Sequence, residues 1–262
     1  MAVFCEASYS VSYIKIEREK GEAVNYEVDD ISQIYFEDPD TVKVVWPKVA
    51  VDGEFDGYSF VDLGLPSGTL WATYNVGATE PKEFGNYYAW GETEPKDFYW
   101  WETYKWCDYE EEERYTQLKY VISDKNGVVD SLMTRLPEDD AATVNWGDSW
   151  RMPTSEELYE FQNSCVWKWE SRDGVGGKIG KSKYNGKRIF LPSAGYKEYS
   201  YIERGDGEAR YWSSTRNDSD YGFTAKAFNF YDGRLVIYED CCMHPSTHDV
   251  YIGNSVRAVV NK

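Results

Sequence analysis

The sequence predicts an α+β protein in which strands and loops outweigh helices. Tyrosine and tryptophan, at 23 and 11 of the 262 residues, supply much of the 42% hydrophobic content, while the mean hydropathy is −0.66. Aromatic and β-branched residues favour strands, whereas a helical chain of this length would be rich in leucine. Short alternating segments bounded by glycine, proline, asparagine or aspartate recur along the chain, and only two segments have the pattern of a short helix.

The net charge of −18 limits the partners of this protein. Phosphate backbones and anionic lipid surfaces attract basic proteins, so we expect no nucleic acid partner and no binding to anionic membranes. No stretch approaches the roughly 20 apolar residues of a membrane span, so we expect no direct membrane insertion. No signal peptide is recognisable either, and the residues alone leave the compartment open.

The five cysteines do not form the regular set of a disulfide scaffold. They stand at positions 5, 107, 165, 241 and 242, an odd number without framework spacing. A bridge between the adjacent Cys241 and Cys242 would be strained. We therefore expect no disulfide scaffold, and whether these two thiols are free stays open.

Residues 1–50 are predicted to form a small β unit. Its strands are expected at residues 13–17, 24–28, 31–36 and 42–46, where apolar and polar residues alternate. The acidic, glycine-containing run 51–57 is typical of a linker. Residues 58–262 then form the main domain.

The main domain opens with a predicted hairpin, residues 58–65 and 69–75, around the turn at 66–68. Tryptophan and tyrosine then crowd residues 84–106. Exposed rings there could stack on sugars, but an aromatic core explains the run better in a domain with few long helices. The acidic run 108–113 could offer oxygen ligands to calcium, although a solvated surface loop explains it better.

Two short helices are predicted next. The first begins at Pro137, with proline at its first position and acidic residues in its first turn, and ends near Trp146. The second begins at the capping box of Thr154 and Glu157. The helix has an apolar stripe that consists of Leu158, Phe161 and Cys165. Because Cys165 lies in this stripe, we expect it to be a buried hydrophobic residue rather than a nucleophile.

Two glycine-containing segments after the helices are predicted as turns. Gly174–Gly177 lacks the spacing and the following helix of a phosphate-binding loop. Asn185-Gly186 has the composition of a type I′ hairpin turn and precedes a strand predicted at residues 188–191.

The C-terminal part of the main domain has a long segment between two predicted strands. Residues 211–215 and 253–259 are aromatic or β-branched and alternate between two faces. Between them, residues 216–254 show no clear helix and are rich in aspartate, asparagine, serine, tyrosine and glycine. Because a long irregular segment pinned at both ends is usually functional, we predict that it presents a surface for binding.

A series of motifs runs along residues 58–260. It consists of Leu63–Ala72, Asn75–Ala78, Phe84–Glu92, Asp139–Ala142, Ser149–Glu157, Ile189–Pro192, Ala194–Tyr196, Tyr211–Thr215 and Ser255–Val259. In this order the motifs closely resemble the Fibrobacter succinogenes major paralogous domain family and its relatives in surface proteins of gut bacteria. The unit before residue 50 resembles, more weakly, a β segment at the front of secreted proteins from the same bacteria.

The resemblance implies a C-type-lectin-like fold for residues 58–262. Such a fold has a small twisted antiparallel sheet, two helices and long surface loops. It also implies that the opening strand at 58–61 lies beside the closing strand at 256–260. Finally, the resemblance implies an extracytoplasmic location at the cell surface.

The same fold occurs in variable proteins that retroelements diversify, including phage receptor-binding proteins. In these relatives, adenine-directed mutagenesis rewrites the segment before the closing strand, and its side chains form the binding face. Such mutagenesis of AAY codons cannot produce Lys, Glu, Gln, Trp or Met. The chain has 60 of these residues but only three within 216–254, where an even spread would give about 10. The deficit fits diversification and also fits a plain loop rich in aspartate, serine and tyrosine, so both interpretations stay open.

We predict a non-enzymatic, extracytoplasmic ligand-binding module without a cofactor or a metal ion. Tyrosine and asparagine suit binding faces because they offer contact area and hydrogen bonds at low entropic cost. The expected ligand is a surface protein or a glycan. The predicted contacts are Asn217, Asp218, Asp220, Tyr221, Tyr231, Asp232, Arg234, Tyr238, His248 and Tyr251.

Two alternative functions stay open. Two cysteines and two histidines between Cys241 and His248 could bind zinc tetrahedrally and make a metal-dependent or oxidative enzyme, although Pro245 disfavours a helical pair of histidines. Formylglycine-generating enzymes share the lectin-like fold, but adjacent cysteines match no motif of theirs. The calcium motifs of sugar-binding C-type lectins are absent, which disfavours calcium-dependent sugar binding. The other alternative is a structural surface or fimbrial component.

Overall fold

The computed structural model describes residues 2–8, 11–17, 24–27, 33–38, 41–45, 49–110, 114–203, 207–218, 223–231 and 243–262. The chain divides into two compact units, Met1–Lys48 and Val49–Lys262. All sheets are antiparallel, and two short α-helices accompany them in the described residues. The fold class is therefore α+β with a predominance of strands.

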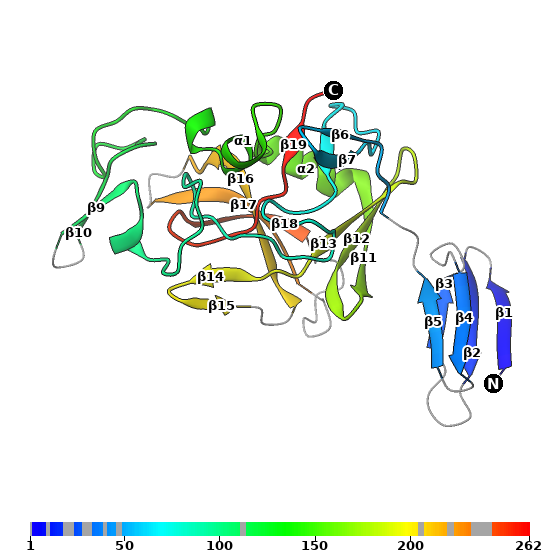
Figure 1. Ribbon diagram of the computed structural model, residues 1–262. Helices are drawn as coiled ribbons and strands as arrows, with labels where there is room; N and C mark the ends of the chain where they lie inside the picture. The colour runs from blue at the N-terminus through cyan, green and yellow to red at the C-terminus, as the bar shows by residue number, and fades with distance from the viewer. Residues whose placement is uncertain are drawn as a thin grey trace. The chain divides into compact units, whose positions relative to one another are not determined.

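The first unit consists of antiparallel strands (Figure 1). One sheet has the order β1-β2-β3, and the other is the hairpin β4-β5. The four predicted strands correspond to β2 to β5, whereas the sequence predicts no strand at β1. The bounds are β1 (Ala2–Ser8), β2 (Val11–Glu17), β3 (Val24–Glu27), β4 (Gln33–Asp38) and β5 (Thr41–Val45).

A four-stranded sheet joins the beginning and the end of the second unit. Its order is β19-β8-β7-β6, and its strands are β6 (Gly53–Phe55), β7 (Tyr58–Val61), β8 (Leu70–Ala72) and β19 (Val259–Val260). The closing strand pairs with β8, so the expected neighbours β7 and β19 share one sheet with β8 between them.

The prediction of a linker at residues 51–57 is wrong. Gly53–Phe55 pairs with β7 through a two-residue turn at Asp56-Gly57. Both turn residues have positive φ, 51° and 82°, as a type I′ turn requires. The aspartate-glycine pair that suggested a flexible connection is therefore a hairpin turn.

The single helix predicted from Pro137 is divided in two. A 3-10 turn, η3 (Pro137–Asp139), is followed by α1 (Ala141–Trp146). Asp140 separates them because its backbone is extended, and its Oδ1 accepts hydrogen bonds from the N–H groups of Ala142 and Thr143 at 2.9 and 3.0 Å. Asp140 is therefore the N-cap of α1.

The second helix, α2 (Ser155–Ser164), begins at the predicted capping box of Thr154 and Glu157. It ends one residue before Cys165, which is buried as predicted. In the part of the chain that the structure describes, no helix is long and apolar enough to cross a membrane.

A three-stranded sheet follows α2 directly. It contains β11 (Cys165–Arg172), β12 (Val175–Ser182) and β13 (Arg188–Pro192). The type I′ turn predicted at Asn185-Gly186 is wrong, since only Gly186 of the two has positive φ. Asn185 Nδ2 instead donates a hydrogen bond to the carbonyl of Asp62 at 2.8 Å, which holds a longer turn.

Shorter elements lie at the periphery. The acidic run 108–113 is not only a loop, because it includes most of β9 (Cys107–Glu110), which pairs with β10 (Arg114–Gln117). The other short elements are η2 (Trp101–Thr103) and the hairpin of β14 (Tyr196–Glu198) and β15 (Tyr201–Glu203).

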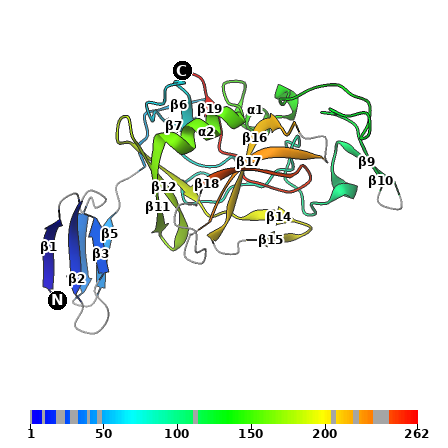
Figure 2. The same cartoon turned by 180° about the vertical axis from the view of Figure 1, so that it is seen from behind.

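The segment predicted to be irregular, residues 216–254, contains two strands. The sheet has the order β16-β17-β18, formed by β16 (Ala209–Arg216), β17 (Thr224–Phe230) and β18 (Met243–Asp249) (Figures 1 and 2). All residues from Val250 to Val260 are buried as well. The prediction of a long surface segment is therefore wrong for these residues.

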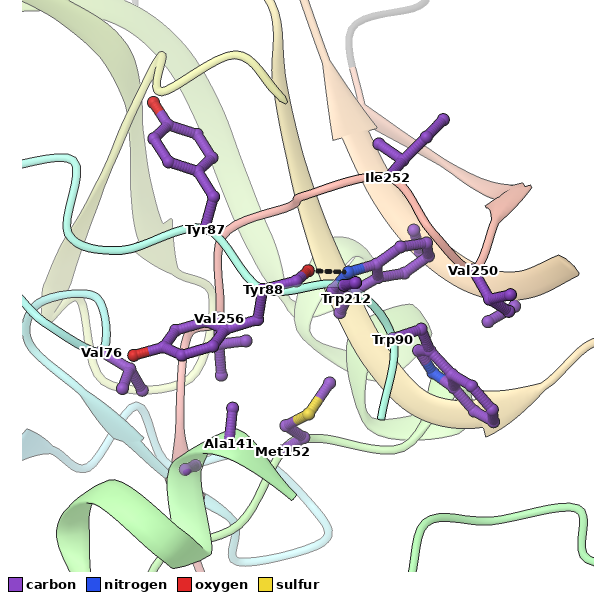
Figure 3. Close-up of a cluster of buried hydrophobic side chains, with 14 of the residues drawn as sticks. Val76, Tyr87, Tyr88, Trp90, Ala141, Met152, Trp212, Val250, Ile252 and Val256 are labelled. Carbon is purple, nitrogen blue, oxygen red and sulfur yellow. Dashed lines mark hydrogen bonds between the residues drawn. The ribbon is translucent and has the colours of Figure 1, made fainter. Parts of the chain in front are cut away.

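Both faces of this sheet pack against hydrophobic clusters. On one face, Trp212, Ala225 and Ala227 belong to the larger cluster. Figure 3 shows the centre of that cluster, where the indole N–H of Trp212 donates to the carbonyl of Tyr88 at 2.7 Å. The opposite face, with Phe228 in it, packs against α2 and its neighbours. The sheet is thus fixed from both sides.

Candidate ligand-binding surface

The predicted contacts divide between the two ends of β17. The connection from β16 to β17 spans residues 217–223, and the connection from β17 to β18 spans residues 231–242. Because the sheet is antiparallel and β17 has seven residues, these connections leave from ends roughly 20 Å apart. Eight of the ten residues predicted as one binding face therefore stand in connections at two opposite ends of the sheet, whereas His248 lies in β18 and Tyr251 follows this strand.

At the first end, Asn217 stabilises the hairpin through its backbone and its side chain. Its N–H donates to the carbonyl of Thr224 at 3.2 Å, and its Nδ2 donates to Thr224 Oγ1 at 2.9 Å. Asp218 is exposed. Asp220 and Tyr221 lie outside the described residues.

Towards the second end, six polar and aromatic side chains converge, and one of them, His248, comes from a residue whose backbone pairs with Ala225 near the first end. We call this group the Arg210 cluster, and it consists of Tyr196, Glu208, Arg210, Asn229, Tyr231 and His248. Arg210 Nε donates to Glu208 Oε1 at 2.7 Å, and the guanidinium carbon lies 3.3 Å from the centre of the Tyr196 ring. An arginine held by a carboxylate and an aromatic face is fixed in orientation.

The hydrogen bonds of His248 assign its tautomer. Arg210 Nη1 lies 3.2 Å from His248 Nδ1, and because a guanidinium can only donate, Nδ1 must be the acceptor. The proton of the neutral ring is then on Nε2. Nε2 lies 2.8 Å from Asn229 Nδ2 and 3.0 Å from Asn229 Oδ1, and of these two atoms only Oδ1 can accept its hydrogen bond. His248, one of the predicted contacts, is therefore a bonded member of the Arg210 cluster.

The two tyrosines of the Arg210 cluster keep their phenolic protons at neutral pH. Burial raises the pKa of Tyr231, and the charge of Glu208 adds to this effect while Arg210 opposes it. Burial also raises the pKa of Tyr196. Both phenols can therefore donate as well as accept hydrogen bonds, and Tyr231 is half-buried where the 231–242 connection begins.

Tyr251 is a core residue, and its prediction as a surface contact is wrong. It is 4% exposed, and its ring packs edge-on against those of Trp100 and Trp101 at 4.9 and 4.5 Å. Its hydroxyl donates to Glu198 Oε1 at 3.1 Å. The remaining predicted contacts, Asp232, Arg234 and Tyr238, lie outside the described residues.

The alternative zinc or oxidative site falls largely outside the described structure. Cys241 and Cys242 lie outside the described residues, as does the side chain of His244. Over the ranges that the structure covers, no three His, Cys, Asp or Glu side chains are grouped so that they could hold a metal ion. Burial raises the pKa of the Cys107 thiol to about 11 and that of Cys165 to about 12. These two thiols are therefore protonated at neutral pH and poor nucleophiles.

Sequence reasoning did not find Arg210, Asn229, Glu208 and Tyr196. Arg210 and Asn229 become neighbours only when β16 and β17 pair, where they stand opposite each other. The one available signal is local, since Glu208 and Arg210 are two residues apart at the beginning of a strand and therefore point to the same side.

Comparison with family models, with curated proteins and with solved structures finds no match to this chain.

Proposed function

We propose that the protein is a non-enzymatic ligand-binding module whose main domain has a C-type-lectin-like fold and acts outside the cytoplasm. The observation that carries the proposal is the sheet β16-β17-β18, which is packed on both faces and leaves long polar connections at its ends. A scaffold fixed in this way lets its connections change without loss of the core. The shared sheet of β7, β8 and β19 is consistent with the closely spaced ends of a lectin-like domain.

The binding face that we propose is the connection 231–242 together with the Arg210 cluster at its base. Arg210, Tyr231 and Asn229 offer fixed donors, acceptors and aromatic surface there. Asp232, Arg234 and Tyr238 would extend this face. The acidic chain favours a ligand that is neutral or cationic.

Paired variants test which end of the sheet binds. The triple variant Asp232→Ser, Arg234→Ser and Tyr238→Ser should abolish binding of the fluorescently labelled protein to bacterial and mammalian cell panels measured by flow cytometry. The matched variant Asp218→Ser, Asp220→Ser and Tyr221→Ser alters the opposite end and should bind normally. Loss of binding only in the second variant would refute the proposed face.

We further propose that a retroelement diversifies this protein. This part of the proposal rests on the deficit of lysine, glutamate, glutamine, tryptophan and methionine in residues 216–254. The buried strand β17 shows that the whole segment is not free to vary, so diversification would concentrate in the two connections. Sequencing the DNA around the gene tests it. A neighbouring reverse transcriptase gene and an imperfect repeat of the 3′ end are expected, and the absence of both would exclude it.

A further inference from the structure

An aromatic surface lies beside the β14-β15 hairpin, away from the segment 216–254 in the sequence. We call it the Tyr199 platform, formed by Phe98, Trp100 and Tyr199. The rings of Trp100 and Tyr199 are stacked, with centroids 4.7 Å apart and an interplanar angle of 23°, and the Phe98 ring meets Tyr199 edge-on at 5.8 Å. Phe98 and Tyr199 are 40% and 39% exposed, and Trp100 is half-buried.

The platform is anchored in the core. The backbones of Tyr99 and Tyr199 exchange two hydrogen bonds of 2.8 and 2.9 Å, which join the loop before η2 to the hairpin. Beneath the platform, the buried Tyr251 packs edge-on against Trp100. The rings are therefore held in place before any ligand arrives, which lowers the entropic cost of binding.

The backbone of Tyr199 has a conformation that tyrosine disfavours. It is the first residue of the two-residue turn between Glu198 and Tyr201, and its φ is +51°. Glycine is the residue suited to that position of such a turn, whereas a bulky side chain is strained there. A strained residue at a surface turn is a reason to look for a function of its side chain.

The chemistry around the platform distinguishes among ligands. Asp97 and Glu198 directly precede Phe98 and Tyr199 in the sequence, and Glu102 follows Trp100 by two residues. Asp97 and Glu102 are exposed, whereas Glu198 accepts the hydrogen bond of the Tyr251 hydroxyl. Carboxylates repel anionic polymers but accept hydrogen bonds from hydroxyl groups. The surface area of three aromatic rings is also far smaller than the roughly 800 Å² that each partner buries in a standard protein interface.

We propose that the Tyr199 platform binds the neutral pyranose rings of a polysaccharide. The C–H groups on one side of a pyranose ring carry partial positive charge and fit the electron-rich face of an aromatic ring. The exposed residues Asp97 and Glu102 would accept hydrogen bonds from the sugar hydroxyls. This site needs no calcium and shares no residue with the proposed face at residues 231–242 and its Arg210 cluster, so either can fail without the other.

Affinity electrophoresis tests the proposal in native gels that contain hydroxyethylcellulose, galactomannan or laminarin, with an albumin gel as control. We expect the wild-type protein to be retarded in at least one polysaccharide gel. Tyr199→Gly should weaken that retardation at least tenfold while Tm stays the same or rises, because glycine relieves the positive φ. Tyr199→Phe should be retarded like the wild type, and so should Tyr159→Ala, which changes a 60% exposed tyrosine on α2.

Three results would overturn the proposal. The first is a wild-type protein that migrates freely in all three polysaccharide gels, or equally slowly in albumin. The second is unchanged retardation of Tyr199→Gly. The third is a clear fall in the Tm of Tyr199→Gly, because the ring would then be kept for packing.

Discussion

The guanidinium carbon of Arg135 lies 3.2 Å from the centre of the Trp90 indole ring, and none of the three side-chain nitrogens of Arg135 has a hydrogen-bond partner. Arg135 is 7% exposed. Burial lowers its pKa to about 10, so the side chain is still charged at neutral pH. An aromatic face compensates only part of the cost of removing such a group from water.

We predict that Arg135→Met leaves the free energy of unfolding unchanged or raises it by about 1–2 kcal/mol. Replacing an unpaired buried charge by an apolar side chain of similar length removes a desolvation cost and keeps the contact with Trp90. Urea denaturation at pH 7 measures the change. A loss of more than about 2 kcal/mol would show that Arg135 stabilises the fold.

Arg257→Met is the matched substitution and should have the opposite effect. Arg257 is also buried, but it donates to Asn75 Oδ1 and to the carbonyls of Ala72 and Phe190 at 2.9, 3.1 and 3.0 Å. Removing it leaves three buried acceptors without a donor, which should cost about 3 kcal/mol or more. Equal stability of the two variants would contradict this distinction.

Trp212→Ala should destabilise the protein by about 3–5 kcal/mol in urea denaturation. The indole ring is fully buried in the larger cluster, and its loss also removes one of the two donors to the carbonyl of Tyr88, the other being the N–H of Asn254 at 3.1 Å. Tyr159→Ala is the control, because its exposed side chain should change stability by no more than about 0.5 kcal/mol. A mild effect of Trp212→Ala would mean that the cluster refills the space.

Glu157 should make the fold sensitive to acid. Burial opposes its ionisation, but hydrogen bonds from Arg151, from the N–H of Thr154 and from Thr69 outweigh burial and place its pKa below the usual 4.5. A carboxyl group with a lowered pKa contributes stability above its unfolded pKa, and this contribution is lost as the pH falls through its folded pKa.

The difference in Tm between the wild type and Glu157→Gln should therefore be largest near pH 7. It should shrink once the pH falls below about 4.5. Glutamine preserves the capping box, so the variant isolates the charge. A difference that does not depend on pH would show that the hydrogen bonds matter and the charge does not.

Alkylation of the cysteines tests whether the protein is a ligand-binding module or an oxidative enzyme. With iodoacetamide at pH 7.5, Cys165 should stay unmodified in the folded protein because it is buried, and Cys107 should react far more slowly than free cysteine because of its raised pKa. Mass spectrometry of peptides gives the rate at each site. Rapid modification of Cys241 or Cys242 at pH 6 would indicate a reactive thiolate and favour the enzyme.

The parts of the fold that depend on neighbours in the sequence could be predicted. The capping box of α2 is an example, since Thr154 and Glu157 bond to each other's backbone within one turn. The turn at Asp56-Gly57 also depends only on neighbours in the sequence, but the glycine-containing acidic run around it predicts a linker, whereas the pair forms a type I′ turn.

The strand β17 could not be predicted for a different reason. Its alanines face one cluster and its phenylalanines the other, so it lacks the simple alternation of a strand with one buried face. Burial on both faces is decided by segments distant in the sequence. The Arg210 cluster likewise depends on the pairing of β16 with β17 and on the return of β18.

The position of β19 has a consequence for biosynthesis. The first sheet of the main domain lacks its edge strand beside β8 until Val259 and Val260 have left the ribosome and paired with β8. A frameshift or an early stop anywhere upstream removes this strand and Arg257 with it, so the product cannot close its core and is exposed to proteolysis. The fold therefore acts as a check on the reading frame, because only chains translated in frame through β19 can close this sheet and present the connections that precede it.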